Sequence, residues 1–175
     1  RTTLSKGGKT IDDNDYLETH GTGTSLGDPI EVLAINNVFK DKKSPLLIGA
    51  VKTNVVHLQP ASGLAGLIKV LLSLKNEQIP ANQNLNNPNR HIDWDSMNLE
   101  VVKKLTSWSD ASKPRVAGVS SFGSGGTVAH VIVEAPPSAE EIEQPKERGH
   151  YLMAFSAKTK NALQNMALRF KEYLQ

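Results

Sequence analysis

The chain has 175 residues, of which 38% are hydrophobic, 5% aromatic and 22% charged, and its formal net charge is +2. A chain of this size can bury the core of one domain, and so small a net charge with few aromatic residues argues against a nucleic-acid or membrane-surface protein. The complete lack of cysteine excludes disulfides, zinc–thiolate sites and a thiol nucleophile within the chain. Its apolar runs are too short for a membrane span, and its first residues do not form a secretory signal, so a cytoplasmic protein is expected.

The first half of the sequence predicts strands that alternate with helices. Residues 1–15 are polar and predict a loop that leads into a short strand at 16–18. Asp28 is a favourable N-cap and Pro29 suits the first turn of a helix that starts there. The apolar positions at helical spacing in this helix are Ile30, Leu33, Ala34 and Val38.

A second strand and a second helix follow. The short apolar run at 46–51 is typical of a buried strand, and a helix is predicted from Pro60 to about Lys75. This helix has almost no polar face, which predicts that it lies buried in the middle of a layered fold.

The second half of the sequence begins with a long loop at 82–94, which is rich in Asn, Pro and His. Three strands are predicted at 99–102, 115–120 and 128–134, so the alternating elements indicate an α/β class. Residues 136–149 contain three prolines and many charges, which is typical of a solvated linker. A strand is predicted at 151–155. A final amphipathic helix places on one stripe Leu163, Met166, Ala167, Phe170 and Leu174.

Two histidine motifs carry the functional information. The first is HGTGTSLGDPIEV, from His20 to Val32, and the second is GAVKTNVVHLQPASGLAGLIKVLLSLK, from Gly49 to Lys75. In this order they resemble the ketosynthase (β-ketoacyl synthase) domains of modular polyketide synthases and fatty acid synthases. The resemblance implies a thiolase-like fold, in which two similar halves stack into a layered α/β/α/β/α sandwich. This chain would supply the C-terminal half only.

The resemblance also implies a domain division and a set of partners. Residues 1–135 correspond to the C-terminal half of the ketosynthase, 136–150 to a linker, and 151–175 to the start of the post-ketosynthase linker or flanking subdomain. The family's nucleophilic cysteine lies before the first histidine motif, which implies an N-terminal ketosynthase half as partner. The other expected partner is an acyl carrier protein bearing phosphopantetheine, and the complete synthase is expected to be a homodimer. No cofactor or metal is expected on this chain itself.

The first motif centres on His20. A lone histidine among glycines is ordinarily structural, and a glycine-rich loop before a helix could also cradle a phosphate. The strand–loop–lysine arrangement of a P-loop is missing, however. The resemblance implies that His20 is one of two active-site histidines that hold the malonyl thioester. It also implies that Thr22 and Thr24 contact the phosphopantetheine arm.

The second motif contains Lys52 and His57, which are five residues apart on a predicted loop and can face one cavity. The positive end of the following helix disfavours the imidazolium form of His57. A neutral imidazole can donate a hydrogen bond to the enolate oxygen that develops during decarboxylation. The resemblance implies that His57 is the second catalytic histidine and that Lys52 orders the site electrostatically. An ordinary exposed charge is the alternative for this lysine.

A third candidate segment is the glycine-rich turn SFGSGGT. The resemblance implies that it borders the active cysteine, with Phe122 as the gate of the acyl channel and Gly123 beside it. A hydrolase that uses Ser121 or Ser124 has little support, because the spacing of a nucleophile elbow is missing. His130 lies on an apolar strand and is expected to be a structural histidine.

Three positions depart from the family pattern. Val128 stands where the family usually has Asn, Val56 where it has Gly, and the pair 59–60 is Gln-Pro in place of Glu-Ala. Valine at position 128 has neither donor nor acceptor, and valine at position 56 is expected to forbid a positive φ. These changes keep open an alternative to condensation, a non-elongating module that transfers or only holds chains.

Overall fold

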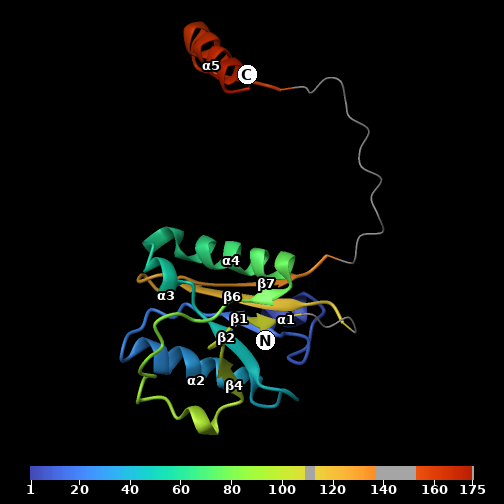
Figure 1. Cartoon of the computed structure of the whole chain (residues 1–175), viewed down its shortest axis with the longest axis vertical. Coiled ribbons are helices and arrows are strands. Elements are labelled where there is room, and N and C mark those ends of the chain that lie inside the picture. Colours follow the sequence, from blue (N-terminus) through green and yellow to red (C-terminus); the bar gives the residue numbers. More distant parts are fainter. Residues whose placement is uncertain (109–112, 137–152, 175) are drawn as a thin grey trace. The chain divides into compact units, whose positions relative to one another are not determined.

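The computed structural model in Figure 1 describes residues 1–108, 113–136 and 153–174. The chain divides into two compact units, Arg1–Pro137 and Ser138–Gln175. The linker predicted at 136–149 lies outside the described residues except for its first position.

The first unit is built on a five-stranded sheet of order β4-β2-β1-β6-β7. The parallel strands are β1 (Tyr16–Glu18), β2 (Leu46–Gly49), β4 (Leu99–Val101) and β6 (Val116–Phe122), and β7 (Val128–Glu134) runs antiparallel to β6. β1 lies at the centre, between β2 and β6, and all three of its residues are buried. Because parallel strands end at the same edge of a sheet, the segments after β1, β2 and β6 meet there.

Helices cover both faces of this sheet (Figure 1), with α2 (Gly27–Phe39) on one side and α4 (Ser62–Asn76) on the other. The α2 side buries Leu17, Val32, Ile35, Phe39 and Ile48 in one cluster. The α4 side buries Tyr16, Val70, Leu74, Ala117 and Val119 in a second. The predicted α/β class is confirmed, and burial of these apolar side chains is what holds the three layers together.

α2 confirms the helix predicted here, but most of the apolar positions that indicated it do not pack on the sheet. Ile30, Leu33 and Ala34 are exposed. The buried residues of the helix are Glu31, Val32, Ile35 and Phe39. The helix has apolar side chains on both sides, so spacing alone did not reveal which side faces the sheet. Asp28 also does not cap the helix as predicted, because α2 begins one residue earlier, at Gly27.

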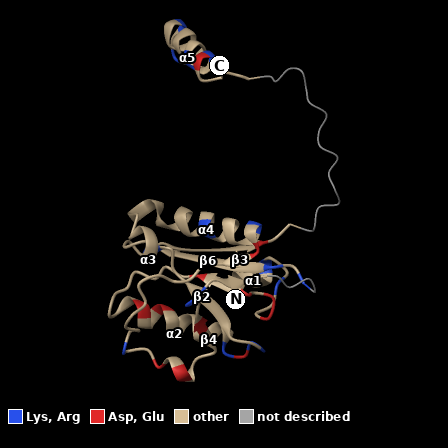
Figure 2. Ribbon diagram, viewed as in Figure 1, with Lys and Arg blue, Asp and Glu red and all other residues tan. Residues whose placement is uncertain are grey.

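α4 is apolar on almost every face, as predicted, but only one side of it is buried in this chain. Val70 and Leu74 pack against the sheet, whereas the opposite side exposes Leu64, Ile68, Leu71 and Leu72. Figure 2 shows that the helix is almost free of charge, and Lys69 and Lys75 are its only charged residues. α4 therefore has the composition of a helix that is buried between two layers, but in this chain only one of its sides is covered.

Several short elements were not predicted from the sequence. They are α1 (Thr2–Lys6), α3 (Lys52–Val55), η1 (Gln59–Ala61), η2 (Trp94–Ser96) and a small antiparallel pair of strands, β3 (Gln78–Ile79) with β5 (Thr106–Ser107). The loop predicted for residues 1–15 is thus wrong where α1 forms. Elements of two to five residues carry too little periodicity to be recognised, because their stability comes from tertiary contacts.

The second unit contains α5 (Lys160–Tyr173), which confirms the predicted amphipathic helix. The Thr159 hydroxyl caps it by accepting a hydrogen bond from the Ala162 N–H at 3.2 Å. The strand predicted at 151–155 is wrong over its described part, 153–155, which is irregular. There the Phe155 ring packs on Phe170, with centroids 4.9 Å apart. Across the described part of the chain, no helix is both long and apolar enough to cross a membrane.

Candidate active site

The three segments that follow β1, β2 and β6 bring three aromatic rings together. The imidazole centroids of His20 and His57 are 5.4 Å apart, edge to face, and the Phe122 ring lies 5.2 Å from His20. His20 belongs to the first histidine motif, His57 to the second and Phe122 to the glycine-rich turn. The sequence-predicted candidates from all three motifs therefore share one site.

The His20 loop is clamped onto the first turns of α2. The Glu31 carboxylate accepts hydrogen bonds from the backbone N–H groups of His20, at 2.7 Å, and Gly21, at 2.9 Å. Asp28 accepts from the Gly23 N–H at 3.1 Å. Gly21 has φ +44°, and a Cβ there would stand 2.6 Å from the Ala50 Cβ, so only glycine fits this position. The backbone that carries His20 is thus fixed on both sides.

Both histidine rings are held in the same orientation with respect to backbone donors. The Phe122 N–H donates to Nδ1 of His20 at 3.3 Å, and the Gln59 N–H donates to Nδ1 of His57 at 3.3 Å. A neutral imidazole that accepts at Nδ1 carries its proton on Nε2. This hydrogen-bond pattern therefore leaves each ring with an Nε2–H group that can donate to a ligand.

The charges around His20 favour its neutral form. Burial lowers the pKa of His20, and the positive charge of Lys52 and the neighbouring His57 lower it further. Burial also lowers the pKa of Lys52, while Glu18 and Glu31 oppose that change. Lys52 is half-buried and lies on α3, not on the loop that was predicted for it. Its charge is one of the causes that lower the pKa of His20.

The two threonines and Gly123 make local hydrogen bonds in the loops that surround the site. The hydroxyl oxygens of Thr22 and Thr24 are 3.5 Å apart, and the Thr24 hydroxyl also accepts from the Gly27 N–H at 3.0 Å, at the start of α2. The Gly123 N–H donates to the Thr127 carbonyl at 2.8 Å and closes the turn that begins at Phe122. The Phe122 side chain is partly exposed at the end of β6.

The turn that carries His57 contradicts the expectation that valine at position 56 forbids a positive φ. Val56 adopts φ +55° and ψ −171°, and Gln59 adopts φ +54°. This conformation is nearly restricted to glycine, and holding another residue in it costs roughly 1–3 kcal/mol. Val56 is also 73% exposed. The turn therefore has a backbone conformation that valine itself disfavours.

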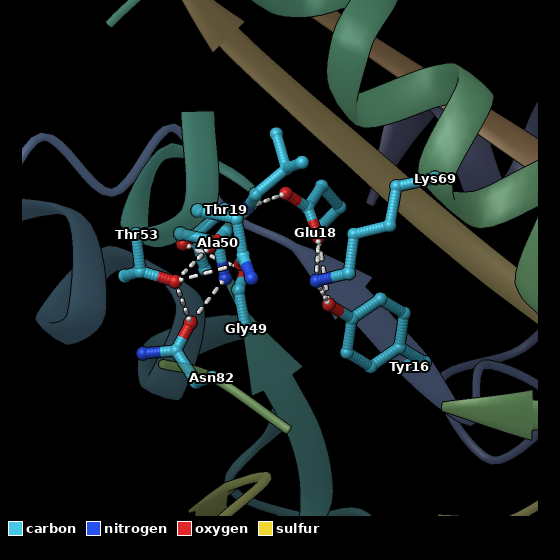
Figure 3. Close-up of polar contacts among 10 residues, drawn as sticks. Tyr16, Glu18, Thr19, Gly49, Ala50, Thr53, Lys69 and Asn82 are labelled. Atoms are coloured by element: carbon cyan, nitrogen blue, oxygen red, sulfur yellow. Dashed lines mark hydrogen bonds and ion pairs between the residues drawn. The ribbon is translucent and has the colours of Figure 1, made fainter. Parts of the chain in front are cut away.

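Sequence reasoning missed a buried polar cluster behind the site (Figure 3). Glu18 is 1% exposed and accepts from the Tyr16 hydroxyl at 2.7 Å, from the Lys69 ammonium at 2.8 Å and from the Val51 N–H. Asn82 accepts from the Ala50 N–H at 2.9 Å. A signal existed, because Glu18 ends an apolar strand and Lys69 interrupts an apolar helix. Two lone opposite charges in buried elements indicate an ion pair.

The remaining histidines lie elsewhere. His130 Nδ1 is 2.9 Å from the Ser120 hydroxyl, so it is a satisfied structural histidine, as expected. His91 lies exposed in the long loop, and His150 is outside the described residues. The Val128 side chain is exposed at the start of β7. Within residues 1–108, 113–136 and 153–174, no cluster of His, Asp or Glu could hold a metal ion.

The helix-covered sheet and the pair of histidines at its strand ends form the arrangement that the resemblance to thiolase-like ketosynthases implies. Comparison with known families gives the same class. Residues 1–86 match the model of the β-ketoacyl synthase C-terminal domain, and residues 88–175 match that of the ketoacyl-synthetase C-terminal extension. The chain belongs to the β-ketoacyl synthase family, and it is a C-terminal ketosynthase domain of the polyketide synthase type.

Relatives and solved structures agree with this assignment. The chain is 41% identical over 177 residues to erythronolide synthase EryA3 of Saccharopolyspora erythraea, covering 99% of the chain and 6% of that protein. The ketosynthase from module 6 of the bacillaene synthase of Bacillus subtilis 168 superposes with a TM-score of 0.72 at 37% identity, covering 97% of the chain and 29% of that structure. The oxazolomycin ketosynthase domain OzmH KS7 of Streptomyces albus JA3453 gives 0.74 at 34% identity, covering 99% and 31%. The chain thus spans a small part of each, and its fold is thiolase-like.

Proposed function

We propose that this chain supplies His20, His57 and Lys52 to a ketosynthase that condenses an acyl thioester with a malonyl unit. The acyl group is held on a cysteine of the complementary N-terminal half, and the malonyl unit arrives on an acyl carrier protein. The observation that carries this proposal is the pair of imidazole rings, whose centroids are 5.4 Å apart and each of which accepts a backbone N–H at Nδ1, so that Nε2 can serve as the donor to a ligand.

The pair of donors suits the first chemical step, the decarboxylation of the malonyl thioester. When the bond between the malonyl carboxylate and the α-carbon breaks, carbon dioxide leaves and the electron pair moves onto the thioester oxygen as an enolate. Two preorganised N–H donors stabilise that developing charge without reorganisation. A cationic imidazole is not required, and the lowered pKa of His20 keeps its ring neutral.

The second step forms the new carbon–carbon bond. The enolate carbon attacks the carbonyl of the acyl–cysteine thioester, and the cysteine leaves as a thiolate. Covalent capture on cysteine splits a difficult reaction into two easier ones. In this scheme Phe122, beside His20, controls access of the acyl chain, and Gly123 borders it. Thr22 and Thr24 contact the phosphopantetheine arm of the carrier protein, and Lys52 orders the site through its charge.

The exposed apolar surface of the chain supports the complementary half as a partner. The outward side of α4 exposes Leu64, Ile68, Leu71 and Leu72. A hollow of about 610 Å³ lies between α1, α2 and Phe122. At about 25 cal/mol per Å² of apolar area, covering a few hundred Å² contributes on the order of 10 kcal/mol. Sedimentation at micromolar concentration is expected to show self-association of the chain alone and a defined complex once the other half is present. In the complete synthase we expect a homodimer.

A different function has its own supporting observation. Val56 strains the backbone beside His57, and Val128 places an exposed apolar side chain where the resemblance implies an amide. Both suit a non-elongating module that docks carrier proteins and transfers or only holds chains, without condensation.

One experiment separates these two functions. The chain is combined with a complementary ketosynthase half, and both acyl loading and decarboxylation of malonyl-carrier protein are measured. Condensation predicts decarboxylation that drops sharply in H20A and H57A and persists in H91A, which removes an exposed histidine of the loop. Acyl loading without any decarboxylation, in every variant, would instead establish the holding module.

A further inference from the structure

We propose that Glu18 is the positioning residue that sets the separation of the two histidines. This inference rests on the proposed function, and it assigns to the buried carboxylate a task beyond that of an ion-pair partner. Glu18 ends β1, two residues before His20, and it contacts both the segment that leads to His57 and the central helix α4. A single side chain thus joins β1, the segment after β2 and α4 (Figure 3).

The contact with the His57 segment is direct. Glu18 Oε1 accepts the hydrogen bond of the Val51 N–H, and Val51 is the N-cap of α3. α3 begins at Lys52 and ends at Val55, immediately before the strained turn of Val56 and His57. The last residue of the sheet on this path is Gly49, so Val51 is the second residue after the segment leaves the sheet. Fixing the Val51 N–H therefore fixes the direction in which the segment from Val51 to His57 starts.

The other oxygen of Glu18 is held from the opposite side. Oε2 accepts from the Lys69 ammonium at 2.8 Å and from the Tyr16 hydroxyl at 2.7 Å. Lys69 lies on α4, and the same helix places Gly66 next to Glu18. A Cβ on Gly66 would stand 3.0 Å from Cγ of Glu18. Gly66 of the helix, the Tyr16 hydroxyl and the Lys69 ammonium lie around the carboxylate and restrain it. It presents Oε1 to Val51 in one orientation.

The neighbouring residue carries the complementary contacts. The Ala50 N–H donates to Asn82 Oδ1 at 2.9 Å, and the Ala50 side chain lies against Gly21 of the His20 loop. Residues 50 and 51 are therefore the place where the two histidine-bearing segments meet. Asn82 secures this place from the long loop, and Glu18 secures it from the strand that carries His20.

Two double variants isolate the positioning contact from the buried charges. E18Q/K69M removes both charges but keeps an oxygen that accepts from the Val51 N–H and an amide that donates to Tyr16. E18M/K69M removes the same charges and keeps a similar volume, but it has no acceptor for Val51. A third variant, V51P, replaces the N–H with a ring carbon and leaves both buried charges in place, and Val51 already has φ −62°, which proline requires.

The readouts are the nuclear Overhauser effect between the ring protons of His20 and His57 in the 175-residue chain, and the kinetics of malonyl-carrier decarboxylation with the complementary half. We expect E18M/K69M and V51P to weaken the ring-to-ring effect and to lower kcat by about 10- to 100-fold, since small displacements of catalytic groups have costs of this size. KM should stay unchanged. E18Q/K69M should retain both the ring contact and most of kcat.

Equal ring contacts and equal kcat in E18M/K69M and E18Q/K69M, with V51P also unchanged, would overturn the inference. If E18M/K69M shows no cooperative unfolding, V51P decides alone, because it leaves the ion pair intact. If no protein decarboxylates, the wild type included, the proposed function fails, and the ring-to-ring effect still decides whether Glu18 positions the histidines.

Discussion

The two histidine segments place the same side chain by opposite means. The His20 loop uses glycine where its backbone needs a positive φ, at Gly21 and Gly23, and its N–H groups are bound by the side chains of α2. The His57 turn has valine at φ +55° and glutamine at φ +54°. Its supports lie upstream, at Ala50 and Val51.

The difference shows how strain can be placed beside a site without loss of the fold. The first loop is stabilised locally, so its geometry is expected to survive changes elsewhere. The second turn stores conformational energy and depends on what surrounds it. In a complete ketosynthase the second turn is accordingly the part of the site that is more sensitive to its neighbours. Four substitutions test this comparison.

The largest effect is expected from E31A. It removes a buried acceptor that binds the N–H groups of His20 and Gly21. Because each hydrogen bond to a charged group contributes roughly 1.5–3 kcal/mol, the free energy of unfolding should fall by about 3 kcal/mol or more. E31Q keeps one acceptor oxygen and should lose about half as much. Denaturant unfolding of both variants makes the measurement, and equal stability of E31A and wild type would show that the His20 loop is not held locally.

The same residue gives a pH dependence. Burial raises the pKa of Glu31, although its hydrogen bonds to Gly21 and His20 oppose the rise. The folded chain then binds this proton more tightly than the unfolded chain, so the contribution of Glu31 to stability decreases as pH rises from its ordinary pKa through the raised value. The stability difference between wild type and E31Q should follow that slope.

V56G should stabilise the chain. Relief of the strained backbone outweighs the extra entropy that glycine has in the unfolded state, which leaves a gain of about 1–2 kcal/mol. V56A is the matched control, because alanine removes the same branched side chain but keeps the penalty for a positive φ. Thermal unfolding should show a higher Tm for V56G alone. A similar rise in V56A would trace the effect to side-chain bulk, and the contrast between the two turns would disappear.

T24A has a smaller expected effect. The Thr24 hydroxyl accepts the Gly27 N–H at the start of α2, and loss of one such hydrogen bond costs about 1 kcal/mol. T24S keeps the hydroxyl and should unfold like wild type in urea. If T24A is as stable as T24S but binds phosphopantetheine more weakly, the hydroxyl serves the ligand and not the helix.

The smallest effect is a change in titration. Burial is the main cause that lowers the pKa of His20, and the charge of Lys52 lowers it further, so K52M should raise the pKa of His20. A lowered histidine pKa makes stability increase as pH rises from the lowered to the ordinary value, and K52M should flatten that increase. K75M removes a lysine at the end of α4 and should change nothing. The measurement is an NMR titration of the histidines. An unchanged pKa of His20 in K52M would exclude Lys52 from the site.

The sequence by itself determined the family, the α/β class and the identity of the candidate groups. Long motifs with fixed order were sufficient for this, because the apolar strands and helices have strong periodicity and His20, Lys52 and His57 lie at their ends. The sequence also indicated that α4 has an apolar surface on more than one side.

Only the tertiary structure decided which groups meet and how they are held. Spacing along α2 did not reveal that Glu31 faces the sheet and binds the His20 loop, since that depends on which side of the helix the sheet covers. The ion pair of Glu18 and Lys69 joins residues 51 positions apart, and the positive φ of Val56 contradicts its own residue type. Local preference sets what each segment favours, and long-range packing decides where a segment must adopt something else.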